Sequence, residues 1–161
     1  MFASALLAGF FAAHAVWSVS DAETLVPIYA YIDASGGRHL ERLVTGTLEG
    51  SVDEGRKWLS ENPHHALCAV LIFDGFIPLS DGKTDALILE IANYGDSAAS
   101  VTMAVPYVPQ GSKVAFKVYR PKIIKFPAGQ NAQDFIESFW KGVDEHKQGA
   151  EVWASHLDQS K

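Results

Sequence analysis

The sequence predicts one α+β domain over residues 1–161, built on a largely antiparallel sheet of about six strands. Three observations predict this class. Segments with helical periodicity lie at both ends and near residue 51, whereas strand-like segments follow one another in runs between them. Short turn motifs join the strands of each run, which is typical of antiparallel sheets. The chain has no repeated segment and no low-complexity linker, so we expect a single domain ordered helix, two strands, helix, four strands, helix.

Composition supports a globular domain and narrows its partners. Of the 161 residues, 48% are apolar and 20% are charged, close to the average of globular proteins. Lys and Arg number 13 against 19 Asp and Glu, a net charge of -6, and no dense basic run occurs. We therefore expect no nucleic-acid partner. The single cysteine, Cys68, excludes a disulfide framework and a thiolate zinc cage.

The first element, residues 1–19, has two interpretations. Apolar residues recur every three or four positions and predict a helix with one buried stripe, made by Phe2, Leu6, Phe10, Ala13 and Trp17. The alternative is an export signal over residues 1–15, because Ala13-His14-Ala15 has the shape of a cleavage site. No Lys or Arg precedes Arg38, which argues against a signal peptide. We expect a folded helix in a cytoplasmic protein, too short to cross a membrane.

Residues 25–33 and 38–48 predict a hairpin around Ser35-Gly36-Gly37. The first strand alternates, with Ile28 and Ala30 on one side and Tyr29 and Tyr31 on the other. A helix is then expected from Ser51, which with Glu54 forms a capping box, to Asn62, where Pro63 stops it.

The centre of the sheet is expected at residues 66–77 and 84–93, which carry apolar residues on both faces. Strands 100–109 and 114–126 follow. Four prolines place the first, fifth and sixth strands at edges or bulges: Pro27, Pro106, Pro109 and Pro121. A sheet buried on both faces needs two covers. We expect the N-terminal helix to supply one and the helix after residue 128, bent or split at Gly142 or Gly149, to supply the other, unless a second subunit does.

Asp74 and Glu90 are the candidate catalytic acids, because each follows an apolar run on a central strand, where burial raises the pKa of a carboxyl group. A two-residue turn at Asp81-Gly82 would place Asp74 opposite Leu89 and Glu90 opposite Phe73, on different faces of the sheet. A turn one residue longer would bring the two acids together.

Candidate ligand-binding residues are Tyr29 and Tyr31 on one face of the first strand, and His39 and Glu41 on one face of the second. The histidines have no metal-ligand spacing: His14 is expected to be partly buried, His64 and His65 to point apart, and His146 and His156 to lie on the surface. Nucleotide-binding and hydrolase motifs are missing too, so we expect no metal and no cofactor.

These observations favour a non-enzymatic binding module for a small ligand or a protein partner, forming a homodimer. One alternative is a small hydrolase or isomerase that uses Asp74 or Glu90 as acid or base. Another is an exported protein that loses residues 1–15.

Overall fold

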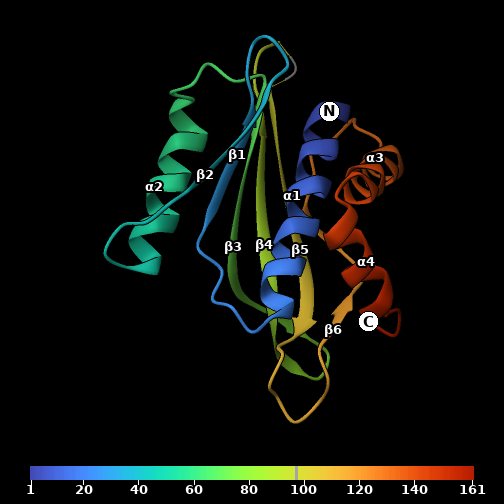
Figure 1. Cartoon of the computed structure of the whole chain (residues 1–161). Helices are drawn as coiled ribbons and strands as arrows, with labels where there is room; N and C mark the ends of the chain where they lie inside the picture. Colours follow the sequence, from blue (N-terminus) through green and yellow to red (C-terminus); the bar gives the residue numbers. More distant parts are fainter. Residues whose placement is uncertain (97) are drawn as a thin grey trace.

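The computed structural model of the chain describes residues 1–96 and 98–161 and confirms the α+β class (Figure 1). Its four helices are α1 (Phe2–Ser20), α2 (Leu48–Glu61), α3 (Ala132–Glu145) and α4 (Lys147–His156). Its strands are β1 (Ile28–Ile32), β2 (Arg38–Arg42), β3 (Cys68–Leu79), β4 (Gly82–Asn93), β5 (Ala99–Val108), β6 (Lys117–Tyr119), β7 (Lys122–Lys125) and β8 (Leu157–Asp158). They form one sheet in the order β2-β1-β3-β4-β5-β6-β8, with β7 also paired to β5.

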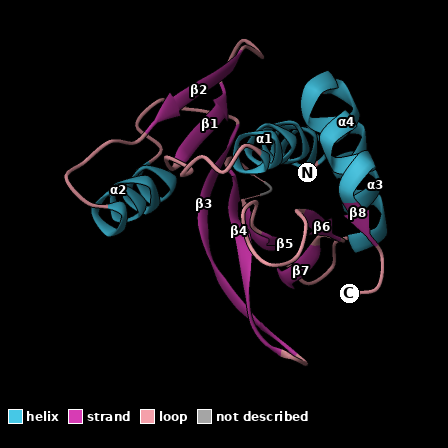
Figure 2. Cartoon of the chain, turned by 60° about the horizontal axis from the view of Figure 1, so that its bottom comes forward, coloured by secondary structure: helices cyan, strands magenta, loops and turns pink. Residues whose placement is uncertain are grey.

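The long hairpin of β3 and β4 forms the centre of the sheet, as predicted (Figure 2). Its turn is Ser80-Asp81, one residue earlier than expected, with Leu79 opposite Gly82. The specific pairs predicted for the acids are therefore wrong by two residues: Asp74 lies opposite Leu87 and Glu90 opposite Leu71. A shift of two keeps every side chain on its face, so the expectation that the two acids point to opposite faces is confirmed.

The edge position that Pro27 predicted for the first strand is wrong. β1 lies inside the sheet between β2 and β3, because Pro27 precedes the strand and takes no part in its ladder. On β5, Pro106 pairs with Ala86 on the β4 side. The other side of β5 pairs with β7 near Met103 and with β6 from Tyr107, so Pro106 lies between these two short strands. The expected strand 114–126 is divided in this way at Arg120-Pro121.

The helices cover the sheet differently from the expected arrangement. Figure 2 shows α1, α3 and α4 on one side of the sheet and α2 on the other. Both ends of the chain thus contribute to the same layer, and the internal helix α2 supplies the second cover. Gly55 allows α2 to approach the sheet closely, because an added Cβ there would collide with the side chains of Leu71 and Leu43.

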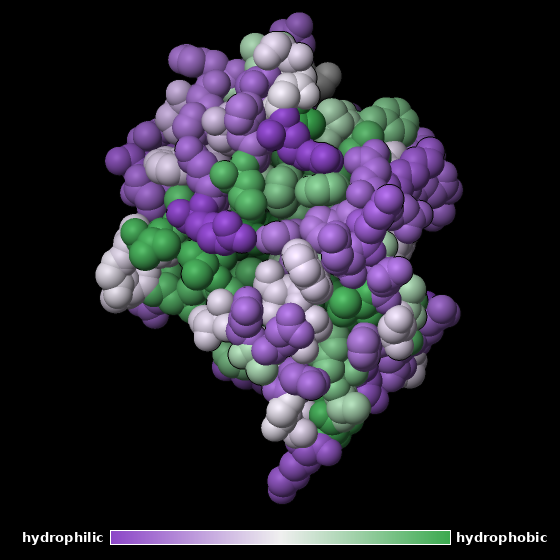
Figure 3. Space-filling model, viewed as in Figure 1, coloured by the Kyte–Doolittle hydropathy of each residue, from purple (hydrophilic) through white to green (hydrophobic). Residues whose placement is uncertain are grey.

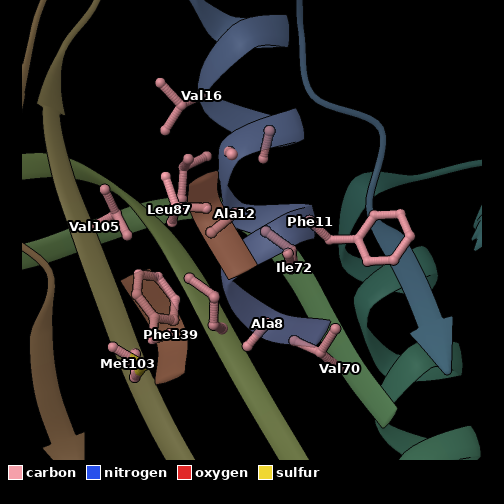
Figure 4. Packing of buried hydrophobic residues seen from close by; sticks show 14 of the residues in the cluster. Ala8, Phe11, Ala12, Val16, Val70, Ile72, Leu87, Met103, Val105 and Phe139 are labelled. Carbon is pink, nitrogen blue, oxygen red and sulfur yellow. The ribbon is translucent and has the colours of Figure 1, made fainter. Parts of the chain in front are cut away.

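Helix α1 is buried between the sheet and the helices α3 and α4. Ala8, Ala12 and Val16 face the sheet, where they meet side chains from β3, β4 and β5 (Figure 4). The predicted stripe is wrong in part, since Phe2 is 65% and Trp17 36% exposed. The alanines occupy the interfaces instead, because small residues allow helices to approach on several sides.

Three glycines set the helix crossings. A Cβ added at Gly9 would collide with the backbone of Phe139, and one at Gly142 or Gly149 with the backbone of Leu6 or Ala13. These glycines therefore permit backbone contact between α1 and the helices α3 and α4 rather than breaking a helix. The break predicted at Gly142 or Gly149 occurs at His146, which ends α3 and caps α4.

By length and apolar composition alone, α1 is sufficient to cross a membrane, so the expectation that it is too short is wrong on that criterion. In the fold most of this helix is buried.

Helix α2 begins three residues before its predicted start. The Thr47 hydroxyl caps it by accepting a hydrogen bond from the Gly50 N–H at 3.0 Å. The predicted capping box is wrong: the Ser51 hydroxyl bonds to the Thr47 carbonyl, and the Glu54 carboxylate accepts from the Trp58 indole.

Candidate functional site

A stack of three rings occupies the α2 side of β1 and β2. The Tyr31 ring lies between His39, with ring centroids 4.8 Å apart, and His64, with centroids 4.2 Å apart and planes at 4°. The cross-strand pairing of Tyr31 with His39 creates the first contact, and the turn after α2 delivers His64 to the other side. His64 was not predicted here. Its only sequence signal is that it follows the Asn62-Pro63 helix end.

Each histidine of the stack has a carboxylate partner. Asp33 Oδ2 lies 2.6 Å from His39 Nε2, and this bond, with further bonds from Ser35 and Gly37, holds the pKa of Asp33 well below its usual range. Glu41 Oε2 lies 3.4 Å from His64 Nε2. Three of the four predicted ligand residues are therefore together, but their rings fill the space between one another.

Tyr29, the fourth, is fully buried beneath α2. Its hydroxyl donates to the Trp58 carbonyl at 3.4 Å, and burial strongly raises its pKa. It supports the sheet under the stack and offers no surface to a ligand.

Asp74 lies in the row of Leu87 and Val105 on the α1 side of the sheet. The Tyr107 hydroxyl donates to its Oδ1 at 2.7 Å. Burial raises the pKa of this carboxyl group, with a smaller contribution from the nearby charge of Asp85, whereas the bond from Tyr107 opposes the rise. On the opposite side of the sheet, residues 73–74 and Arg56 border a hollow of about 290 Å³ beneath α2, away from the bond between the Asp74 carboxyl group and Tyr107.

Glu90 lies on the opposite face and has a cationic partner. Arg56 of α2 grips its carboxylate from two nitrogens, Nε at 3.0 Å and Nη2 at 2.7 Å from Oε1. The pair borders a groove of about 330 Å³ with Thr102 and Lys125. Glu90 thus anchors α2 to the sheet, and the two predicted acids do not share a site.

A second histidine pair joins α1 to the start of α4. His146, predicted on the surface, is only 8% exposed, because it caps α4 beneath the rings of Phe10 and Trp17. The Gly149 N–H donates to His146 Nδ1 at 3.0 Å, so the proton of the neutral imidazole is on Nε2. That Nε2 lies 3.2 Å from His14 Nδ1 and donates to it. His14 therefore carries its own proton on Nε2.

This proton arrangement leaves two donors face to face. His14 Nε2 lies 3.4 Å from Arg42 Nη2, and both atoms carry hydrogen, so they do not bond to each other. Burial, then the neighbouring His146 and the charge of Arg42, lower the pKa of His14. Over the described part of the chain, no carboxylate oxygen lies within 4.0 Å of the Arg42 guanidinium.

Two hollows share the segment 24–26 as part of their lining, and one of them is also lined by both donors. The polar hollow, about 100 Å³, is lined by His14, Ser18, Glu23 and Arg42 among others. The apolar hollow, about 230 Å³, lies between this segment and the connection from β2 to α2. Figure 3 shows apolar side chains gathered at this side of the molecule, next to strongly hydrophilic ones. The sequence did not reveal this site, because its parts come from three segments: α1, residues 23–28 and residues 42–51.

Other chemistry has little support. Cys68 is buried in β3, and burial raises the pKa of its thiol to about 11, so it is a poor nucleophile. Residues 1–96 and 98–161 contain no group of three or more His, Cys, Asp or Glu side chains placed to hold a metal ion. Comparison with protein-family models, curated proteins and solved structures gives no match to this chain.

Proposed function

We propose that this chain is a non-catalytic binding module that takes a small ligand in the paired hollows beside residues 24–26. One observation carries the proposal: His14 Nε2 and Arg42 Nη2 are two donors, 3.4 Å apart, that face each other with no acceptor between them. Because the contact is exposed, both donors are open to an acceptor supplied by a ligand in place of water. The Glu90 carboxylate is bonded by Arg56. Beside the ring stack, Glu41 Oε2 and His64 Nε2 are buried 3.4 Å apart without a hydrogen bond, in a space that the rings of Tyr31, His39 and His64 fill.

Nuclear magnetic resonance of the ¹⁵N-labelled protein tests the location of the site. A small panel of organic acids, amines and neutral fragments is titrated, and backbone amide shifts are followed. We expect the largest shifts at Leu25, Val26 and Val44. The proposal would be contradicted if the panel shifted only the backbone amide signals near Ser60 and Thr102, at the groove beside Glu90, or shifted no signal at all.

The homodimer and the cytoplasmic location belong to the same proposal. The homodimer is supported by exposed apolar side chains on the sheet, among them Phe76 of β3, which is 61% exposed. Sedimentation at micromolar concentration tests this, and a strict monomer contradicts it. The burial of α1 supports its retention rather than export, and the intact mass of the protein from its native host would reveal any loss of residues 1–15.

Catalysis at Asp74 is the second candidate function. It is favoured by the raised pKa of the Asp74 carboxyl group and by its hydrogen bond from the Tyr107 hydroxyl. In this proposal, Asp74 acts as the general acid of a hydrolase or isomerase. Turnover in a substrate screen that disappears with Asp74→Asn would support it. Unchanged turnover would remove Asp74 from the mechanism.

A further inference from the structure

We propose that the ligand of the paired hollows is a monocarboxylate with an unbranched alkyl chain of medium length, a free fatty acid. This inference rests on the proposed function and names its ligand class. The carboxylate would lie against His14 and Arg42, and the chain would lie across Val26 in the apolar hollow.

The head of the ligand follows from the donors. Arg42 supplies one positive charge, and the neutral His14 ring supplies an N–H. The other arginine of β2, Arg38, is not available, since it pairs with Glu145 and its guanidinium lies 3.6 Å from the centre of the Phe10 ring. A carboxylate has two acceptor oxygens and one charge, and it matches this pair.

The rim of the polar hollow limits the charge of the head. Glu23 lines the same hollow, and its carboxylate is more than 4.0 Å from Arg42. A dianionic phosphate would bring two charges to one arginine beside this acid, and one of them would stay uncompensated. The site therefore favours a single negative charge.

The apolar hollow selects the tail. Its apolar lining is aliphatic, formed by Leu25, Val26, Pro27, Leu43, Val44 and Leu48. The hydroxyls in its wall are committed to the start of α2: Thr45 Oγ1 donates to the Thr47 carbonyl, Thr47 Oγ1 accepts from Gly50, and Ser51 donates to the Thr47 carbonyl. These bonds leave few polar groups for a peptide tail, chiefly the hydroxyls of Thr24 and Thr47, whereas an alkyl chain needs none.

Calorimetric titration of the full chain at pH 7.5 tests the ligand class. Octanoate is expected to bind. Hexanoate should bind about tenfold more weakly and decanoate about tenfold more tightly, and acetate should give no signal. 1-Octanol, which has the same chain and no charge, is expected to bind about tenfold more weakly than octanoate. N-acetyl-alanyl-leucine, a carboxylate with amides in its tail, is also expected to bind more weakly.

Variants assign the two halves of the site. Arg42→Gln is expected to weaken octanoate about tenfold and leave octanol unchanged, whereas Val44→Ser weakens both about equally. Glu23→Gln is expected to tighten octanoate about twofold, since it removes a like charge. Arg120→Gln, at a distant exposed arginine whose side chain bonds to the Lys161 carbonyl, is the control. Circular dichroism melting verifies that each variant folds.

The possible failures are distinct. Octanol binding as tightly as octanoate, an unaltered octanoate affinity in Arg42→Gln, or tighter binding of acetate or the peptide would overturn the fatty-acid proposal. If none of these compounds binds but fragments still shift the amides of Leu25 and Val26, the ligand class is wrong and the proposed function stands. If nothing shifts those amides, the proposed function fails as well.

Discussion

The imidazoles of His14 and His146 are each held in one neutral form. Protonation of His146 at Nδ1 would break the cap on Gly149, and protonation of His14 at Nδ1 would set two N–H groups against each other. Burial and the charges of Arg42 and Arg38 act in the same direction, so the pKa values of both rings are lowered. The unfolded chain therefore binds these protons more readily than the folded one.

The free energy of unfolding is thus expected to fall as the pH falls through the histidine range. Between pH 7.5 and 5.5 we expect this pair to lower the free energy of unfolding, measured by urea denaturation. His146→Asn keeps a side-chain oxygen for the cap and removes one titrating ring. Its free energy of unfolding should therefore fall less with pH than that of the parent protein. His65→Gln, at an exposed histidine, should behave like the parent protein. An identical pH dependence in His146→Asn would contradict the argument.

Asp74 offers a prediction of opposite sign. Because burial raises the pKa of its carboxyl group, the folded state holds this proton more tightly than the unfolded state, and that contribution is lost as the pH rises. Asp74→Asn keeps an acceptor for the Tyr107 hydroxyl and removes the buried charge. We expect its free energy of unfolding at pH 7 to equal or exceed that of the parent. A loss above about 2 kcal/mol would show that the carboxylate itself stabilises the fold.

At the scale of elements, glycine determines how the helices meet. The crossings of α1 with α3 and α4 bring backbone against backbone, so the packing has no room for one methyl group. Helix propensity would favour alanine at these positions by about 1 kcal/mol, and the close contact outweighs it.

Gly142→Ala is therefore expected to destabilise the protein by about 3 kcal/mol or more, through its collision with the Leu6 carbonyl. The matched control is Gly46→Ala, in the connection before α2, where nothing lies within 4 Å of the added Cβ and φ is not positive. Chemical denaturation of both variants measures the difference. Equal stability of the two would mean that α1 and α3 do not approach as closely as described.

Helix α2 illustrates what local sequence rules miss. The pair Ser51 and Glu54 fits a capping box, yet Thr47 begins the helix and Ser51 is buried. By N-cap preference alone, Thr47 and Ser51 are both suitable first residues for this helix. Packing of Val52 and Gly55 against β3 and Leu43 fixes which one caps, and that contact is not visible in the local pattern.

At the scale of the whole molecule, α1 is the element on which the fold most depends. It contributes eleven buried residues and contacts the sheet, α3 and α4. Removing residues 1–15 would expose the apolar side of β3 and β4 and forfeit burial on the order of 10 kcal/mol, comparable with the stability of a whole domain. We expect the variant covering residues 16–161 to lack a cooperative melting transition by circular dichroism. Removal of residues 159–161, as a control, should leave that transition in place.

The sequence predicted the strands of the sheet better than the positions of the helices that pack on its two faces. Period-two and apolar patterns located β1 and the central hairpin, because strand periodicity reports which face each side chain takes. The side on which a helix packs is set by residues far along the chain: Gly142 meets Leu6, and Gly149 meets Ala13. For the same reason the site was only partly predicted. His39, Glu41 and Tyr31 are neighbours across one hairpin, whereas His14, Arg42 and His146 meet only in the finished fold.

The position of α1 has a consequence for biosynthesis. This apolar helix leaves the ribosome before the helices α3 and α4 that cover it, because more than 100 residues separate them in the chain. At ordinary rates of translation the two events are separated by on the order of ten seconds. During that interval the nascent chain displays a bare apolar segment, so chaperones and membrane-targeting factors reach it before its own partners do.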